Sequence, residues 1–286
     1  MVIGKSRLMG RRDALTMLGA VGALSLVGCG RGSGDTDAGR QPPLAASGRD
    51  NKEGGLNLKS IGVLGGLGPQ ATMDFEARLH QVAQRLIPQR ENSGYPPMVL
   101  YYHRFPPILL NEDSSPRFPI QPDPRLLEAA KRVGAIVDFM VITSNGAHLV
   151  QEQIEQTAGR KVLSMIDVTL EEVRRRQWRK VGVLGFGDPM VYTKPLGEMK
   201  LAFETIEGEL RGKLDGSIMR VMEGRDDAGS AGIARDAVAA LRARGVEGII
   251  LGCTEIPLLL GGSASEPDLV NPAQLLAEAA VRYALA

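Results

Sequence analysis

The sequence predicts an α/β fold of two similar lobes, each a parallel sheet with helices on both faces, with a cleft between them. Two segments, IGVLGGLGP at 61–69 and VGVLGFGDP at 181–189, have nearly the same sequence. Each is typical of a buried strand that runs into a glycine turn. The stretches 134–145 and 245–254 repeat a second pattern, a helix end followed by an apolar strand that finishes in small polar residues. Only 4% of residues are aromatic while 35 are glycine, which favours alternating strands and helices over an aromatic-rich sandwich. We infer an internal duplication.

The first 28 residues are expected to be an export signal rather than part of the fold. Arg11 and Arg12 precede an apolar stretch that is too short to span a bilayer comfortably. The phrase RRDALTML resembles a twin-arginine signal, and the Leu-Val-Gly-Cys tetrad that ends at Cys29 resembles a bacterial lipobox. A plain signal with a chance cysteine is the alternative. The two signatures in this order predict an exported protein, held by lipid on Cys29 to the membrane on the periplasmic side of a bacterial cell envelope.

The remaining chain divides into a tether and two lobes. Residues 29–57 are rich in Gly, Pro and charge and are predicted to be a disordered tether. We expect lobe 1 at 58–165, lobe 2 at 166–270, and a C-terminal helix at 271–286 that returns to lobe 1. The 34 basic and 33 acidic residues nearly balance and form no basic stripe, so we exclude a nucleic-acid partner.

Ligands of parallel sheets bind beyond the carboxyl ends of the strands. That rule places four turns around one cleft, at 65–68, 144–145, 185–188 and 253–254. The turn at 66–71 also fits a loose dinucleotide fingerprint. The next expected strand, at 98–102, is followed by His103-Arg104 and not by the acid that such a site needs, so we set a nucleotide aside.

Four segments together resemble one enzyme family. GVLGGLGPQAT at 62–72, SNGAH at 144–148, LGCTEIPLLL at 251–260 and NPAQLLAEAAVRYA at 271–284 resemble the aspartate/glutamate/hydantoin racemase family, over about residues 58–286. LGCTEIPLLL is the most specific of them. The resemblance implies two thiols that face each other across a cleft. One removes the Cα proton of an acidic amino acid and the other returns a proton to the opposite face, without metal or organic cofactor.

Cys253 matches the second of these thiols. A free thiol has a pKa near ~8.5 that falls at a helix N-terminus, so we expect Cys253 to be partly thiolate. The alternative is an inert core cysteine, which the polar neighbours Thr254 and Glu255 argue against.

Ser144 stands where the family places its first catalytic cysteine. A serine needs a base to activate it, and His148, four residues on, offers a Ser144–His148 relay. Alternatively, His148 satisfies a local backbone group and Ser144 is a helix N-cap. Three functions stay open: racemisation with a preference for one enantiomer, decarboxylation with one cysteine as in a related branch, and binding of acidic amino acids without turnover.

The substrate-binding residues are predicted from their places at the cleft and from the resemblance. Backbone N–H groups at the turns can hold carboxylates. No residue matches the family's carboxylate-binding arginine. Arg104 and Arg117 lie close by in the sequence as substitutes, and the alternative for each is a solvated surface charge. The oligomeric state, a homodimer included, is left open. The predicted binding residues are Gly66, Gly68, Arg104, Asn145, Gly146, Tyr192, Thr193 and Thr254.

Overall fold

The computed structural model describes residues 57–91, 93–112, 115–225 and 228–286. The expected export signal, Cys29 and nearly all of the expected tether lie outside these ranges. The described residues belong to one compact unit. None of their helices has the length and hydropathy needed to cross a membrane.

Each half of the fold alternates strands and helices along the chain. The first half contains β1 (Ile61–Gly65), α1 (Pro69–Leu86), β2 (Met98–Tyr102), α2 (Pro124–Gly134), β3 (Phe139–Ile142), the 3-10 helix η1 (Gly146–Val150), α3 (Gln151–Ala158) and β4 (Val162–Leu163). The second half contains α4 (Met165–Arg175), β5 (Lys180–Leu184), α5 (Met190–Glu198), β6 (Ala202–Thr205), α6 (Gly208–Met222), α7 (Ala228–Ala243), β7 (Gly248–Leu251), α8 (Ile256–Leu260), the 3-10 helix η2 (Gly261–Ser265), β8 (Leu269–Val270) and α9 (Pro272–Leu285).

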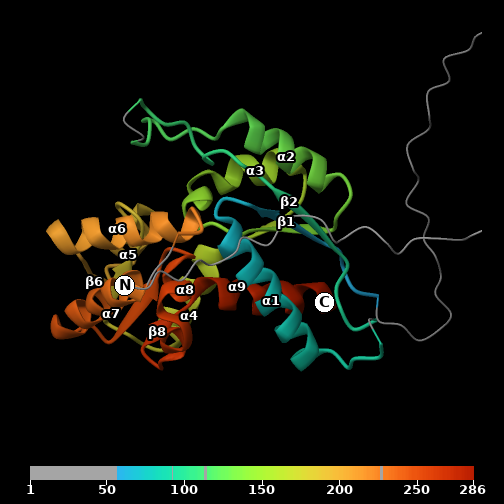
Figure 1. Ribbon diagram of the computed structural model, residues 1–286. Coiled ribbons are helices and arrows are strands. Elements are labelled where there is room, and N and C mark those ends of the chain that lie inside the picture. The colour runs from blue at the N-terminus through green and yellow to red at the C-terminus, as the bar shows by residue number, and fades with distance from the viewer. Residues whose placement is uncertain (1–56, 92, 113–114, 226–227) are drawn as a thin grey trace, which may run out of the picture. The chain divides into compact units, whose positions relative to one another are not determined.

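The two halves have the same sheet topology (Figure 1). The strand orders are β2-β1-β3-β4 and β6-β5-β7-β8, and every pairing is parallel. The register is also repeated, because Leu64 pairs with Ile142 in one sheet and Leu184 with Leu251 in the other. The predicted duplication and the two-lobed α/β class are confirmed.

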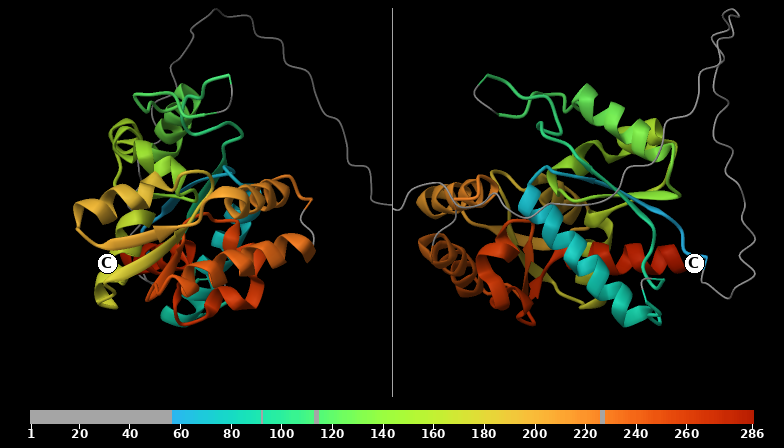
Figure 2. Two further views of the ribbon diagram at one scale, coloured as in Figure 1. Left: turned by 90° about the vertical axis from the view of Figure 1, so that its left-hand side faces the viewer. Right: turned by 45° about the vertical axis from the view of Figure 1, so that its right-hand side comes forward.

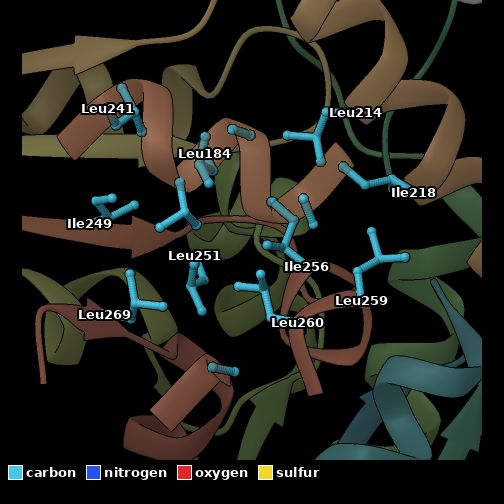
Figure 3. Close-up of a cluster of buried hydrophobic side chains, with 14 of the residues drawn as sticks. Leu184, Leu214, Ile218, Leu241, Ile249, Leu251, Ile256, Leu259, Leu260 and Leu269 are labelled. Carbon is cyan, nitrogen blue, oxygen red and sulfur yellow. The ribbon is translucent and has the colours of Figure 1, made fainter. Parts of the chain in front are cut away.

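Helices cover both faces of each sheet. In the second half, α6, α7 and α8 pack on one face around a cluster of leucines and isoleucines (Figure 3), while α4 and α5 pack on the other. In the first half, α2 and α3 cover one face, and α1 and α9 cover the other. The central strands β1, β3, β5 and β7 are almost fully buried and, apart from Lys180 at the start of β5, have no polar side chain, as expected for a sheet covered on both faces.

The last helix returns to the first half of the chain. α9 begins at Pro272 after Asn271, whose side chain accepts a hydrogen bond from the Ala273 N–H at 3.0 Å. It packs against α1 and α4, and Figures 1 and 2 show it in red beside α1 in teal. The Lys59 N–H donates to the carbonyl of Ala284 at 2.9 Å, so the two ends of the described fold are joined.

Candidate active site

A pocket of about 210 Å³ lies where the carboxyl ends of strands from both halves meet. Leu67 reaches it from the turn after β1, and the turns after β3, β5 and β7 supply the polar lining. All four turns that the sequence predicted to surround one cleft therefore do so. No Arg, Lys or His occurs among the described residues that line it. The polar lining residues are Ser144, Asn145, Asp188, Cys253, Thr254 and Glu255.

Ser144 and Cys253 occupy equivalent places in the duplicated halves. Ser144 lies two residues beyond the end of β3 at Ile142, and Cys253 lies two residues beyond the end of β7 at Leu251. Because β3 and β7 hold the same position in their sheets, the repeat brings these two side chains to the same pocket. Cys253 thus lines the pocket and also packs against the apolar core of the second half.

The thiol of Cys253 is held by an acid. Its Sγ donates to Oε2 of Glu255 at 3.1 Å. Burial, and then the negative charge of Glu255, raise the pKa of the Cys253 thiol well above its ordinary value. The expected lowering of this pKa by a helix N-terminus is therefore wrong. α8 has only five residues, and the Glu255 carboxylate lies between its first turn and the sulfur.

Glu255 is a buried acid that sequence reasoning treated only as a polar neighbour. Glu255 is only 3% exposed, and its Oε2 also accepts a hydrogen bond from the Thr254 hydroxyl at 3.0 Å. Oε1 is buried without a hydrogen-bond partner among the described residues. Burial raises the pKa of Glu255, so this carboxyl holds a proton more readily than a surface acid does. Glu255 and Cys253 can thus exchange one proton along their hydrogen bond. An acid placed directly before the apolar run at 256–260 was the available signal.

The glycine turn after β1 gives shape to the pocket. A Cβ at Gly68 would lie 2.0 Å from Oε1 of Glu255, so only glycine leaves room for that carboxyl. Gly66 has φ +79°, and a Cβ there would meet the His103 backbone at 2.7 Å. The Gly66 N–H already donates to the Thr72 hydroxyl at 2.8 Å, so it is not available to a substrate carboxylate.

The predicted Ser144–His148 relay is wrong. The Nδ1 of His148 donates to the Ser144 carbonyl at 2.7 Å, and its Nε2 accepts from the Met165 N–H at 3.0 Å. Burial lowers the pKa of His148 to about 4, so the ring is neutral at pH 7. The alternative, a histidine that satisfies backbone groups, is confirmed. Ser144 is not an N-cap either, because Asn145 occupies that position of η1. Among the described residues no group hydrogen-bonds to the Ser144 hydroxyl, which lines the pocket.

Asn145 is positioned by a buried tyrosine. The Tyr192 hydroxyl donates to Oδ1 of Asn145 at 2.6 Å, and burial raises the Tyr192 pKa far above its ordinary value. Asn145 is 5% exposed, and within the described chain its Nδ2 has no partner. Asn145 also lines the pocket, so this amide is the candidate side-chain donor for a ligand there. Tyr192 acts through Asn145 and does not line the pocket, and neither does Thr193. Gly146 lines it, next to Asn145.

Arg104 lies outside this pocket. It is exposed and sits 4.8 Å from the ring centre of Tyr102. It lines a separate cavity of about 500 Å³ with His103, Phe105 and Arg125. The structure therefore does not bring the predicted carboxylate-binding arginine to Cys253. In the described part of the chain, no group of three or more His, Cys, Asp or Glu side chains is placed to hold a metal ion.

Comparisons with known proteins agree with this fold. The family model described as Asp/Glu/hydantoin racemase matches residues 64–280. An aspartate racemase of Picrophilus torridus has a similar structure, with a TM-score of 0.66 and 20% identity over 79% of this chain and 94% of that one. An aspartate racemase homologue from Pyrococcus horikoshii gives a TM-score of 0.61 and 23% identity over 79% of this chain and 99% of that one.

A curated relative matches a shorter stretch. The broad specificity amino-acid racemase RacX of Bacillus subtilis is 28% identical over 130 residues, which are 44% of this chain. The match spans 53% of that relative, about half of its length. The family model covers both halves of the fold and every lining residue of the pocket. On this evidence the chain belongs to the Asp/Glu/hydantoin racemase family.

Proposed function

We propose that this chain is a cofactor-independent isomerase that moves the Cα proton of a free α-amino acid. The observation that carries the proposal is the placement of Cys253 and Ser144. They stand at equivalent positions of two duplicated halves, and both line one pocket. A substrate held between them would present its Cα to a thiol on one side and a hydroxyl on the other. The unpartnered Nδ2 of Asn145 is a donor for the α-carboxylate.

The Cys253–Glu255 hydrogen bond supplies the base. The thiol passes its proton to Glu255, and the resulting thiolate removes the Cα proton, so that the electron pair of the broken C–H bond moves into the α-carboxylate. A proton then reaches the opposite face from Ser144 or from a water that it holds. Glu255 releases its proton to solvent, and solvent replaces the proton lost on the Ser144 side, which returns the chain to its starting state.

The two directions should differ in rate. Cys253 has a buried acid as its partner, whereas Ser144 has no base among the described residues. Proton removal should therefore be fast for the enantiomer whose hydrogen faces Cys253 and slow for its mirror image. Equilibrium still yields equal amounts of both enantiomers, so the asymmetry must appear in kcat and KM together.

Hydrogen exchange at Cα in D₂O tests the proposal. Purified protein is incubated with a panel of single-enantiomer amino acids, and deuterium at Cα is followed by mass spectrometry. Cys253→Ala should abolish exchange, and Ser144→Cys should raise exchange of the slow enantiomer by about 10²–10⁴-fold. Cys29→Ala removes the other cysteine and is the control that should keep full exchange. Exchange that survives Cys253→Ala would overturn the proposal.

The pH profile tests the role of Glu255. The Glu255 carboxylate must be free to take the thiol proton, and burial raises its pKa. The acid limb of kcat/KM should therefore lie above the ordinary carboxyl range, with activity lost as pH falls through it. Glu255→Gln should slow exchange and remove this limb. If the acid limb of kcat/KM persists in Glu255→Gln, that limb belongs to another titrating group and not to Glu255.

A second candidate is a reaction that needs only one proton-transfer residue, such as decarboxylation of a malonate-like acid. The absence of a base for Ser144 among the described residues favours it. Release of CO₂ from such acids by the wild type, unchanged by Ser144→Ala and abolished by Cys253→Ala, would establish it. Binding without any exchange or CO₂ release would leave the third option, a binding protein.

We further propose that the protein is exported and tethered by lipid on Cys29. The support is the order of the signatures, an arginine pair, a short apolar stretch and the Leu-Val-Gly-Cys tetrad. The tether of small and charged residues would then hold the racemase fold near the outer face of the inner membrane or within the envelope. The substrate pool would be the free amino acids of that compartment.

A further inference from the structure

We propose that the substrate of this site carries an uncharged aliphatic side chain, as in methionine, leucine or norleucine, and not a second carboxylate. This inference rests on the proposed function, because it concerns the side-chain subsite of the same pocket. It replaces the acidic amino acid that the family resemblance implied.

The charge of the lining opposes an acidic side chain. Asp188 and Glu255 are the two ionisable acids of the lining, and the described lining residues include no cation. Among the described lining residues, Asn145 Nδ2 is the one buried side-chain donor without a hydrogen-bond partner, and we assign it to the α-carboxylate. A distal carboxylate would therefore lie beside two acids, with no positive charge among the described lining residues to pair with, and this repulsion is unfavourable.

The same charges leave no place for a cationic side chain. The Oε2 of Glu255 already accepts from Cys253 and Thr254, and its Oε1 lies against Gly68. Asp188 is thus the acid that remains, and the α-ammonium group of any amino acid takes it. A second ammonium would have no partner in the pocket.

The walls of the pocket are apolar. Phe186 follows β5, Met190 opens α5, and Met219 and Met222 lie near the end of α6. Phe186 is 50% and Met219 39% exposed, and both are among the large apolar side chains that the fold leaves open to solvent. A substrate side chain that lies between them would cover this surface. Methionine is flexible and polarisable, so the wall can adapt to aliphatic chains of different length.

Matched substrates test the charge rule. Norleucine and lysine share the same carbon chain and differ by the terminal ammonium, while methionine and glutamate are similar in length. Initial rates of Cα exchange in D₂O should rank norleucine above lysine and methionine above glutamate, by roughly tenfold or more in kcat/KM. Faster exchange of glutamate or aspartate than of methionine would overturn the inference. So would faster exchange of lysine than of norleucine.

A substitution in the wall tests the place of the subsite. Met219→Lys puts a cation beside the substrate side chain and should raise the ratio of glutamate to norleucine kcat/KM by roughly tenfold or more. The matched control is Met73→Lys. Met73 is an exposed methionine of α1, 54% accessible, that does not line the pocket, and its substitution should leave the ratio unchanged. Equal changes in both variants would overturn the inference.

Binding separates this inference from the proposed function. Dissociation constants of norleucine and glutamate, measured by calorimetry on the wild type and Met219→Lys, report the subsite without turnover. Tighter binding of norleucine together with no exchange of any amino acid would refute the isomerase and retain the apolar subsite. Exchange that is fastest with glutamate, together with tighter glutamate binding, would retain the isomerase and refute the apolar subsite.

Discussion

Mild acid should destabilise the protein through His148. The pKa of this histidine is about 4 in the fold against 6.5 ordinarily, because burial disfavours the charged ring. Protonation would also remove the acceptor for the Met165 N–H. Since the unfolded chain binds the proton more tightly, the contribution is full above about pH 6.5 and is lost as pH falls through 4. The difference between 6.5 and about 4 corresponds to about 3 kcal/mol, of which about 2 kcal/mol is lost between pH 7 and pH 5.

Urea unfolding of the wild type and His148→Gln at pH 7 and pH 5 measures this loss. A glutamine amide can donate to the Ser144 carbonyl and accept from the Met165 N–H, but it does not titrate. The wild type should therefore lose about 2 kcal/mol more than the variant between the two pH values. Buried acids such as Glu255 act in the opposite direction, and their effect cancels because both proteins contain them. Equal losses in the wild type and His148→Gln would refute the argument.

Three further predictions concern the site and the anchor. Gly68→Ala should cost about 1–3 kcal/mol of stability and most of the exchange activity, because its Cβ displaces Glu255; a fully active variant would contradict the packing. Tyr192→Phe should cost about 1–3 kcal/mol by leaving the Oδ1 of Asn145 buried and unpaired. It should also raise KM more than it lowers kcat. Steady-state kinetics measures both, and a fall in kcat larger than the rise in KM would contradict this positioning role. Finally, labelled fatty acid should appear on the wild type and not on Cys29→Ala, and its absence from the wild type would disprove lipidation.

Much of the architecture could be predicted because it depends on pattern along the chain. The duplication was predicted by the two similar glycine-rich segments, at 61–69 and 181–189, and by the apolar strands at 134–145 and 245–254. β2 also lies where the sequence placed a strand, at Met98–Tyr102. Ser144 and Cys253 follow equivalent strands of the two sheets, so the duplication placed each at the carboxyl end of its own sheet, and in the fold both line one pocket.

The contacts of single side chains could not be predicted in this way. A spacing of four residues places His148 near Ser144, but it does not say whether the ring meets the hydroxyl or the carbonyl. The ring meets the carbonyl because its other nitrogen is held by the Met165 N–H, which is 17 residues away. The pKa of Cys253 was predicted in the wrong direction for a similar reason. A motif shows that an acid is near, whereas only the fold shows that its carboxylate turns back onto the sulfur.

The return of α9 to the first half sets the order in which the protein can be completed during synthesis. The apolar face of α1, with Phe75 and Leu79, is closed by Leu276 and Val281, which are synthesised after all the other described helices and strands. Until then the nascent chain exposes that face, although every strand of the first sheet has already been made. A chain that stops before α9 should aggregate readily and be cleaved easily by proteases. On the proposed twin-arginine route, which carries folded cargo, the signal would be made well before α9 but could be used only after α9 has packed.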